Sequence, residues 1–331
     1  MKERVKQGLS FLLRFGLSAA LLVYLFQKDD LIAAVADIKS ADLIYLGLAL
    51  ACNFLIYSIL LLRWNIIIKG LHLSLSLASI AKWFWIGIFF NLTLPTSTGG
   101  DIIKAIGLCK GTSDRAKVIA SILLDRIFGF IAITLIAFVS YFSVHQVANN
   151  YFLLITIVAL FVVSWGGLLF LLNEKLYMFV CGIFNRLPRV KEKLLKLHQA
   201  IALIRGQVSL MVVVIALSCA CQILLGLAYF LTVKGLHQEI SLIYCIAFAP
   251  LVCVASSLPS VGGFGFRESA FVYLFMKVGF LEAKAKSIAL LNSLYMIFFS
   301  FVGACVYVSS VFTRRVQRNP SDSTDGGAKN H

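Results

Sequence analysis

The feature that most constrains this chain is a series of apolar stretches long enough to cross a lipid bilayer. A helix needs about 20 apolar residues for that. The 331 residues are 60% hydrophobic and 14% charged, whereas soluble domains average about 45–50% and about 25%. We therefore expect an all-α polytopic membrane protein with six full spans, at about 9–26, 42–62, 118–142, 151–173, 207–233 and 286–311.

Two further apolar regions, 79–109 and 241–277, are interrupted near their centres. Proline lacks a donor N–H and glycine loses the most backbone entropy on ordering, so neither continues a helix well. Each region is therefore either one kinked span or a re-entrant pair of half-helices. The residues predicted to break the helices are Pro95 in the first region, and Pro259 and Gly265 in the second.

Charge placement favours re-entrant pairs, because Lys and Arg concentrate in short cytoplasmic loops. The basic N-terminus lies inside, and Arg63 and Lys69 return the chain to the cytoplasm before the first pair. The basic stretch 110–117 follows that pair, which therefore enters from the cytoplasm. The basic linker 174–205 and the arginines of the C-terminal tail also belong inside. The second pair must then enter from the exterior.

These orientations predict an inverted repeat of span, re-entrant pair and span, an arrangement typical of transporters built from discontinuous helices. Both termini are expected in the cytoplasm. We expect a single transmembrane domain over 1–312 and a disordered cytoplasmic tail over 313–331. Its first half is 42–142 with the re-entrant pair 79–109, and its second half is 207–311 with the pair 241–277.

The remaining composition excludes several classes of function. The net charge is +15, and the basic residues cluster between the apolar spans. This placement favours loops that face anionic lipid over nucleic-acid binding. The eight cysteines and five histidines lack metal-ligand spacing, so we expect no metal and no cofactor. The first apolar run exceeds a signal-peptide core and predicts an uncleaved span. The basic 183–205 stretch is either an amphipathic interfacial helix or a solvated loop helix.

Charged residues inside the predicted membrane are the candidate functional residues. Such residues are rare, cost about 2.5–3.5 kcal/mol each at a helix centre on translocon scales, and usually mark a substrate path. Arginine grips phosphate bidentately, and helix N-termini offer free N–H groups to anions. We therefore expect a phosphate headgroup to be bound by cationic side chains and loop glycines: Arg126, Arg267, Lys104, Gly99, Gly100, Gly262 and Gly263.

Three carboxylates accompany these cations, namely Asp101, Asp125 and Glu268. We expect them to act as counter-charges when the site is empty, or as proton carriers. The alternative is that the charges only pair with each other and pin the broken helices, since interior ion pairs can serve fold specificity. The glycines have their own alternative, which is close helix packing. We assign no catalytic residue.

The same motifs are similar to a known family. Leu94-Pro95 through Gly99-Gly100-Asp101, Asp125-Arg126 with Gly129, and Leu258-Pro259 through Arg267-Glu268 resemble the flippase-like transmembrane region of lysylphosphatidylglycerol synthases. The resemblance covers about residues 8–312. It implies a multi-pass protein of the bacterial cytoplasmic (inner) membrane that moves a lipid between leaflets. The synthases carry a soluble aminoacyltransferase domain, and this chain ends in a short polar tail, so we expect no enzyme activity.

The expected substrate is an anionic or aminoacylated phospholipid, or a related glycolipid. Expected partners are a second copy of the chain or an enzyme of envelope lipid synthesis. Two other functions stay open. One is a membrane glycosyl- or acyl-group transferase that uses Asp101 or Glu268 as a base, and the other is a non-transporting scaffold.

Overall fold

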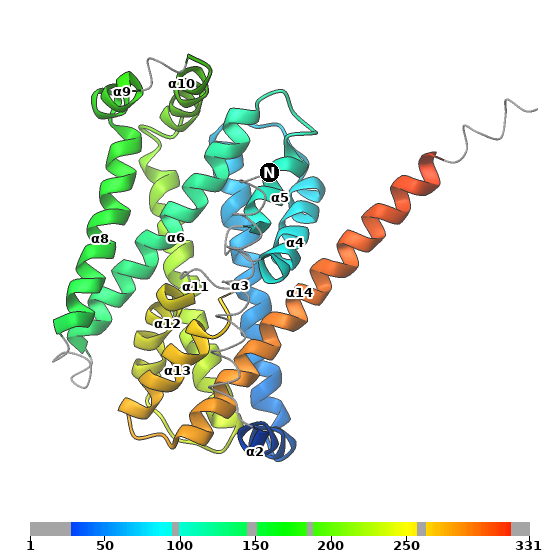
Figure 1. Cartoon of the computed structure of the whole chain (residues 1–331), viewed down its shortest axis with the longest axis vertical. Coiled ribbons are helices and arrows are strands. Elements are labelled where there is room, and N and C mark those ends of the chain that lie inside the picture. Colours follow the sequence, from blue (N-terminus) through cyan, green and yellow to red (C-terminus); the bar gives the residue numbers. More distant parts are fainter. Residues whose placement is uncertain (1–27, 95–98, 144–150, 184–187, 257–262, 319–331) are drawn as a thin grey trace, which may run out of the picture.

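The computed structural model describes residues 28–94, 99–143, 151–183, 188–256 and 263–318, and these form helices without strands. Figure 1 shows them as an elongated bundle. The helices are α2 (Lys28–Lys39), α3 (Leu43–Gly70), α4 (Leu77–Thr93), α5 (Gly99–Leu108), α6 (Arg115–Ser143), α8 (Tyr151–Leu172), α9 (Glu174–Ile183), α10 (Pro188–Ala202), α11 (Val208–Gly235), α12 (Leu242–Ser256), α13 (Phe266–Lys277) and α14 (Glu282–Arg318).

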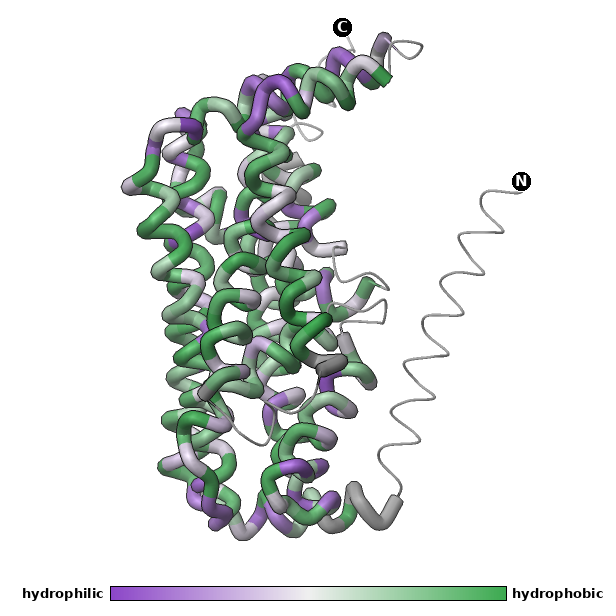
Figure 2. The backbone as a smooth tube through the Cα atoms, turned by 90° about the vertical axis from the view of Figure 1, so that its left-hand side faces the viewer, coloured by the Kyte–Doolittle hydropathy of each residue, from purple (hydrophilic) through white to green (hydrophobic). Residues whose placement is uncertain are grey.

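Five of the described helices, α3, α6, α8, α11 and α14, are long and apolar enough to cross a membrane. They correspond to five of the six predicted spans, and the chain is a polytopic membrane protein. The predicted first span, 9–26, lies outside the described residues. Figure 2 shows that hydrophilic residues gather at the two ends of the bundle, while the middle is mainly hydrophobic. The exposed apolar side chains of this middle belt are suited to contact lipid.

Two helices end later than expected. α3 continues to Gly70 rather than ending near residue 62, so Arg63 lies inside it and is buried. The prediction that the span ends near residue 62, with Arg63 after it, was therefore wrong. α14 continues to Arg318, so the first six residues of the predicted tail, 313–318, are helical. The rest of that tail lies outside the described residues.

The central axis of the bundle is an antiparallel pair, α3 and α11. At one end Gln207 Nε2 donates to the carbonyl of Gly70 at 3.1 Å. At the other end the Asp42 amide donates to the carbonyl of Gly235 at 2.9 Å. Asp42 also caps α3 by accepting from the Ile44 amide at 2.8 Å. This pair fixes the frame on which the shorter helices pack.

The two interrupted regions form the two short-helix pairs that the sequence predicts, α4/α5 and α12/α13. The helices of the first pair have 17 and 10 residues, and those of the second have 15 and 12. At 1.5 Å per residue each is shorter than the roughly 30 Å of bilayer hydrocarbon. Figure 1 places the pairs toward opposite ends of the bundle. Pro95, Pro259 and Gly262 lie outside the described residues.

Small residues allow the close packing of these short helices. A Cβ on Gly100 would meet the carbonyl oxygen of Gly87 and the side chain of Asn91, both on α4. A Cβ on Gly107 would meet the ring of Trp83. The Gly100 amide also donates to Asn91 Oδ1 at 2.9 Å. The seam between α4 and α5 therefore requires glycine, as close helix contacts in membranes generally do.

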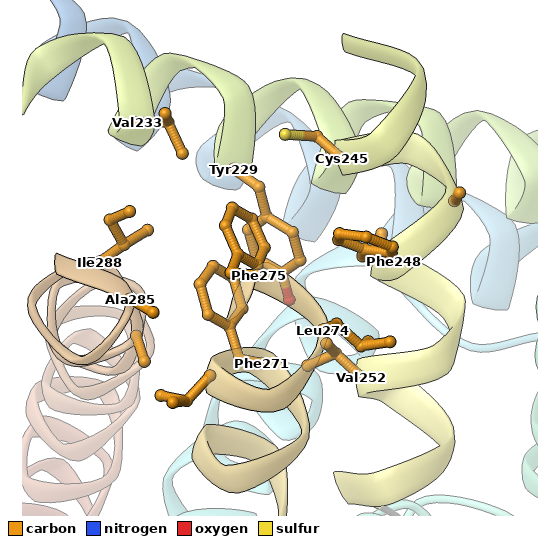
Figure 3. Close-up of a cluster of buried hydrophobic side chains, with 14 of the residues drawn as sticks. Tyr229, Val233, Cys245, Phe248, Val252, Phe271, Leu274, Phe275, Ala285 and Ile288 are labelled. Carbon is orange, nitrogen blue, oxygen red and sulfur yellow. The ribbon is translucent and has the colours of Figure 1, made fainter. Parts of the chain in front are cut away.

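The second pair is anchored by an aromatic core. Phe271 and Phe275 of α13 stack with ring centroids 4.1 Å apart, and Phe248 of α12 lies 5.5 Å from Phe275. Figure 3 shows these rings filling the space between α11, α12 and α14. Tyr229 of α11 meets Phe271 edge-on at 5.1 Å. This packing fixes the orientation of α13 and of the charged residues at its start.

Candidate functional site

The first group of charged residues joins α5 to α6. Arg126 Nε donates to Asp101 Oδ2 at 2.5 Å. Lys104 Nζ lies 3.3 Å from Asp101 Oδ1, and it also lies 5.1 Å from the ring centroid of Phe84. Asp101 and Lys104 are buried, but the Arg126 side chain is 40% exposed. Asp101 thus pairs with two cations, Lys104 and Arg126, and the Arg126 side chain remains partly exposed.

Asp101 and Lys104 are positioned by their own short helix. Asp101 lies in the first turn of α5, where the helix dipole favours a negative charge. Gly87 of α4 makes room for the aliphatic stem of Lys104, because a Cβ at Gly87 would meet that stem. The glycines between α4 and α5 therefore allow the two helices to pack closely and also leave space for the Lys104 side chain.

Beside this group lies an ion pair that sequence reasoning missed. Arg63 of α3 donates to Asp125 of α6 through Nε at 2.8 Å and lies 2.7 Å away through Nη2. Its Nη1 donates to Ser218 of α11 at 2.9 Å. Asp125 therefore partners Arg63 rather than a residue of the broken helices. The available signal was the absence of a helix breaker between Arg63 and Gly70, which indicates that the helix continues past Arg63.

The second group of charged residues lies at the start of α13. Glu268 is 2% exposed and accepts four hydrogen bonds. Its Oε2 accepts from the Gly265 amide at 2.7 Å, which caps the helix. Its Oε1 accepts from Arg267 Nη2 at 2.5 Å, from Arg267 Nε at 3.1 Å and from Ser293 Oγ of α14 at 2.6 Å. The Arg267 guanidinium also lies 5.2 Å from the Phe264 ring centroid.

Two glycines before α13 have backbone conformations that side chains rarely adopt. Gly263 has φ +81° and Gly265 has φ +89°. A Cβ at Gly263 would also lie 3.1 Å from the Ser256 carbonyl oxygen, at the end of α12. Gly265 is the residue directly before α13, and its positive φ agrees with the helix-breaking role that the sequence predicts for it. The geometry places Gly263 and Gly100 in tight packing, and Gly99 is likewise buried.

The charged groups face two adjoining cavities inside the bundle. The first, of about 300 Å³, is lined by Arg63, Lys104, Arg126, Asp101 and Asp125, and we call it the Arg126 cavity. The second, of about 250 Å³, is lined by Arg267 and Glu268, and we call it the Arg267 cavity. These volumes are near the lower end of small-molecule sites. The two cavities share four lining residues: Tyr57, Leu60, Cys253 and Ser256.

The two cavities differ in charge. Three cations and two carboxylates line the Arg126 cavity, so 3 − 2 leaves one positive charge. One cation and one carboxylate line the Arg267 cavity, so its formal charge is zero. Gln222 also lines the Arg126 cavity, and its buried Oε1 has no hydrogen-bond partner among the described residues. The Arg126 cavity thus offers cations for an anion and an acceptor for a hydroxyl or ammonium group.

Comparison with known proteins gives a consistent result. Residues 11–303 match the family described as lysylphosphatidylglycerol synthase TM region. The chain is also 25% identical over 280 residues to the protein named "UPF0104 membrane protein PH1989" of Pyrococcus horikoshii. That alignment covers 77% of this chain and 83% of the relative. No solved structure matches the chain.

Proposed function

Because this chain belongs to the family of the lysylphosphatidylglycerol synthase transmembrane region, we propose that it is a lipid translocase. It moves an anionic or aminoacylated phospholipid between the leaflets of the bacterial cytoplasmic membrane. The observation that carries the proposal is the pair of adjoining cavities, each with charged side chains beside a break between short helices. A headgroup can occupy such cavities while its acyl chains stay in the bilayer.

Arg126 is the first contact for the phosphate in this mechanism. Its side chain is 40% exposed, whereas its partner Asp101 is buried and also paired with Lys104. A phosphate that approaches Arg126 therefore replaces part of a carboxylate contact, and Lys104 keeps Asp101 compensated. Arginine–phosphate bonds are charge-assisted and bidentate, which supports Arg126 as the side chain that orients the headgroup.

Arg267 is the corresponding contact in the second cavity. Its side chain is 15% exposed and its counter-charge Glu268 is 2% exposed. Because Tyr57, Cys253 and Ser256 line both cavities, a headgroup that leaves Arg126 reaches Arg267 without crossing hydrocarbon. The predicted inverted halves would connect the two leaflets by rocking about this point.

The hydrogen bonding of the carboxylates favours counter-charge over catalysis. Glu268 accepts hydrogen bonds from Gly265, Arg267 and Ser293, so donors of the protein itself already contact both of its oxygens. Asp101 is held between Arg126 and Lys104. Cationic partners stabilise the ionised form of a carboxylate and weaken it as a base. A transferase would change the mass of the lipid, whereas a translocase changes only its leaflet.

The test is leaflet redistribution in liposomes that contain the purified protein. Fluorescent phosphatidylglycerol, cardiolipin and lysylated phosphatidylglycerol are the substrates, and dithionite reports the outer-leaflet fraction. Arg126→Gln is expected to slow movement at least tenfold, because a hydrogen bond to a charged group contributes about 1.5–3 kcal/mol. Lys277→Gln is the matched control, since Lys277 is exposed at the far end of α13. Equal rates for both variants would contradict the proposal.

Arg267 needs a double variant, because its removal alone leaves Glu268 buried without its cation. Arg267→Gln is therefore compared with the double change Arg267→Gln and Glu268→Gln. We expect the double variant to recover thermal stability and to remain deficient in translocation. A double variant that recovers transport would assign Arg267 to fold stability alone.

A further inference from the structure

A third and larger hollow lies at one end of the bundle, away from the two charged cavities. It is a groove of about 1000 Å³ between α10, the start of α6 and His72 beyond α3. None of its lining residues also lines the Arg126 or the Arg267 cavity. Figure 1 places α9 and α10 across this end of the bundle, beside the C-terminal end of α8. We call it the α10 groove.

The α10 groove has a basic rim. Arg115, Lys117, Lys193 and Lys196 line it together with one carboxylate, Asp114, so 4 − 1 leaves three positive charges. Lys117 pairs with Asp114 at 3.1 Å, and Lys196 pairs with Glu192 at 2.6 Å. For Arg115 and Lys193 the described part of the chain holds no carboxylate within 4 Å. Both side chains are exposed.

The wall below this rim is apolar. Leu194, Leu197 and Ala200 follow one another at helical spacing along α10, and Leu203 comes directly after its last residue. Ile119 of α6 lines the same groove with 49% of its surface exposed. The adjoining stripe of α10 is fixed to the bundle, and Leu194, Leu197 and Leu203 also pack in part against its core. His198 stacks on Tyr177 of α9 at 4.3 Å between ring centroids, and Ile201 is fully buried. The groove is therefore a surface on a fixed helix, lined by exposed cationic side chains and by apolar side chains.

We propose that the α10 groove is a binding site for an anionic phospholipid of the adjacent leaflet. The phosphate lies between Arg115 and Lys193, and an acyl chain lies along Ile119 and the leucines of α10. Charge complementarity selects an anion, and the apolar wall selects one that carries hydrocarbon. This end also carries the basic loops that the positive-inside rule assigns to the cytoplasm, where anionic lipids are attracted by basic pockets.

The test measures lipid binding to the full chain by native mass spectrometry from neutral detergent. The wild type is titrated with phosphatidylglycerol and, separately, with phosphatidylcholine. The test variant is Arg115→Gln with Lys193→Gln. The control is Lys110→Gln with Lys175→Gln, which removes the same charge from exposed positions that do not line the groove. Each cation near the surface contributes about 1 kcal/mol, so we expect about thirtyfold weaker binding in the test variant and little change in the control.

Two further arms identify the ligand. Inorganic phosphate at the same concentration should not displace phosphatidylglycerol, because it makes no contact with the apolar wall. Ile119→Asn should weaken binding of the long-chain lipid and leave the Arg126-dependent translocation unchanged. Equal binding by the test and control variants would overturn the proposal. Displacement by inorganic phosphate would also overturn it, because the groove would then be a general anion site.

Discussion

The most informative residue is Arg63, because a single side chain joins three helices at the edge of the Arg126 cavity. It bonds Asp125 of α6 and Ser218 of α11 from its own position on α3. The Arg63 and Asp125 side chains are 7% and 20% exposed. Removal of one partner from a buried ion pair leaves an uncompensated charge, whereas replacement of both partners by apolar residues is often tolerated.

We therefore predict that Arg63→Leu destabilises the protein by about 3–5 kcal/mol. The double variant Arg63→Leu with Asp125→Leu should recover most of that loss. The measurement is the midpoint of unfolding in detergent for the wild type, both single variants and the double variant. If the double variant is no more stable than Arg63→Leu, the pair does not act as a unit and the ion-pair interpretation is wrong.

Sequence reasoning marked Asp101, Lys104, Arg126, Arg267 and Glu268 as charges within the membrane region, because ionisable residues in long apolar runs are easy to recognise. Of these, Asp101, Lys104 and Glu268 are buried, whereas the Arg126 side chain is 40% exposed. Sequence reasoning did not find the ion pair of Arg63 with Asp125. Asp125 and Arg126 are adjacent in sequence, but they point about 100° apart on a helix of 3.6 residues per turn. Which one meets Arg63 depends on the rotation of α6 against α3, and tertiary packing decides that rotation.

At the scale of the helix, the α4/α5 seam makes a distinct prediction. Gly100→Ala would push a methyl group into the Gly87 carbonyl and Asn91. Overpacking of this kind costs about 1–3 kcal/mol. Gly166→Ala in α8 is the control, since no atom lies within 4 Å of its built Cβ. In the control we expect unchanged or slightly higher stability, because alanine favours helix by about 0.5–1 kcal/mol over glycine.

The two glycine variants are compared by thermal unfolding and by the yield of monodisperse protein. Similar behaviour of Gly100→Ala and Gly166→Ala would show that the seam accommodates a methyl group. Gly100 would then be available for the ligand role that its sequence position predicts.

Tyr57 gives a second prediction at this scale, and it rests on the proposed translocase function. The residue lies on α3, lines both cavities and packs 4.7 Å from Phe299 and 5.8 Å from Trp85 between ring centroids. The Tyr57 ring therefore lies on the wall that the two small cavities share. We predict that Tyr57→Ala increases movement of a neutral-headgroup lipid such as phosphatidylcholine, because it widens the passage between the cavities. Tyr57→Phe keeps the ring and should retain the wild-type selectivity.

The readout for Tyr57 is the ratio of phosphatidylcholine to phosphatidylglycerol redistribution in the same liposomes. A ratio that is unchanged in Tyr57→Ala would show that the ring does not control passage. Loss of movement of both lipids together with lower stability would instead assign Tyr57 to the packing of α3.

For the whole molecule, sequence reasoning was most successful where chain physics leaves few alternatives. Five predicted spans coincide with described helices, because apolar length alone determines whether a helix can cross a bilayer. The two interruptions were predicted because proline and glycine end helices. The adjoining cavities were not predicted, since their walls come from eight helices far apart in sequence: α3, α4, α5, α6, α11, α12, α13 and α14. The inverted relation of the two halves stays a prediction.

The inverted relation is tested by the sides on which two loops emerge. Ser113 lies between α5 and α6, and Leu281 lies between α13 and α14, where it is 75% exposed. Figure 1 places these loops at opposite ends of the bundle. Leu281→Cys should react with a membrane-impermeant maleimide in intact cells, whereas Ser113→Cys should react only after permeabilisation. The eight native cysteines require a wild-type background measurement. Labelling of both positions from the same side would place the two short-helix pairs in one orientation, and the two halves would then not be inverted.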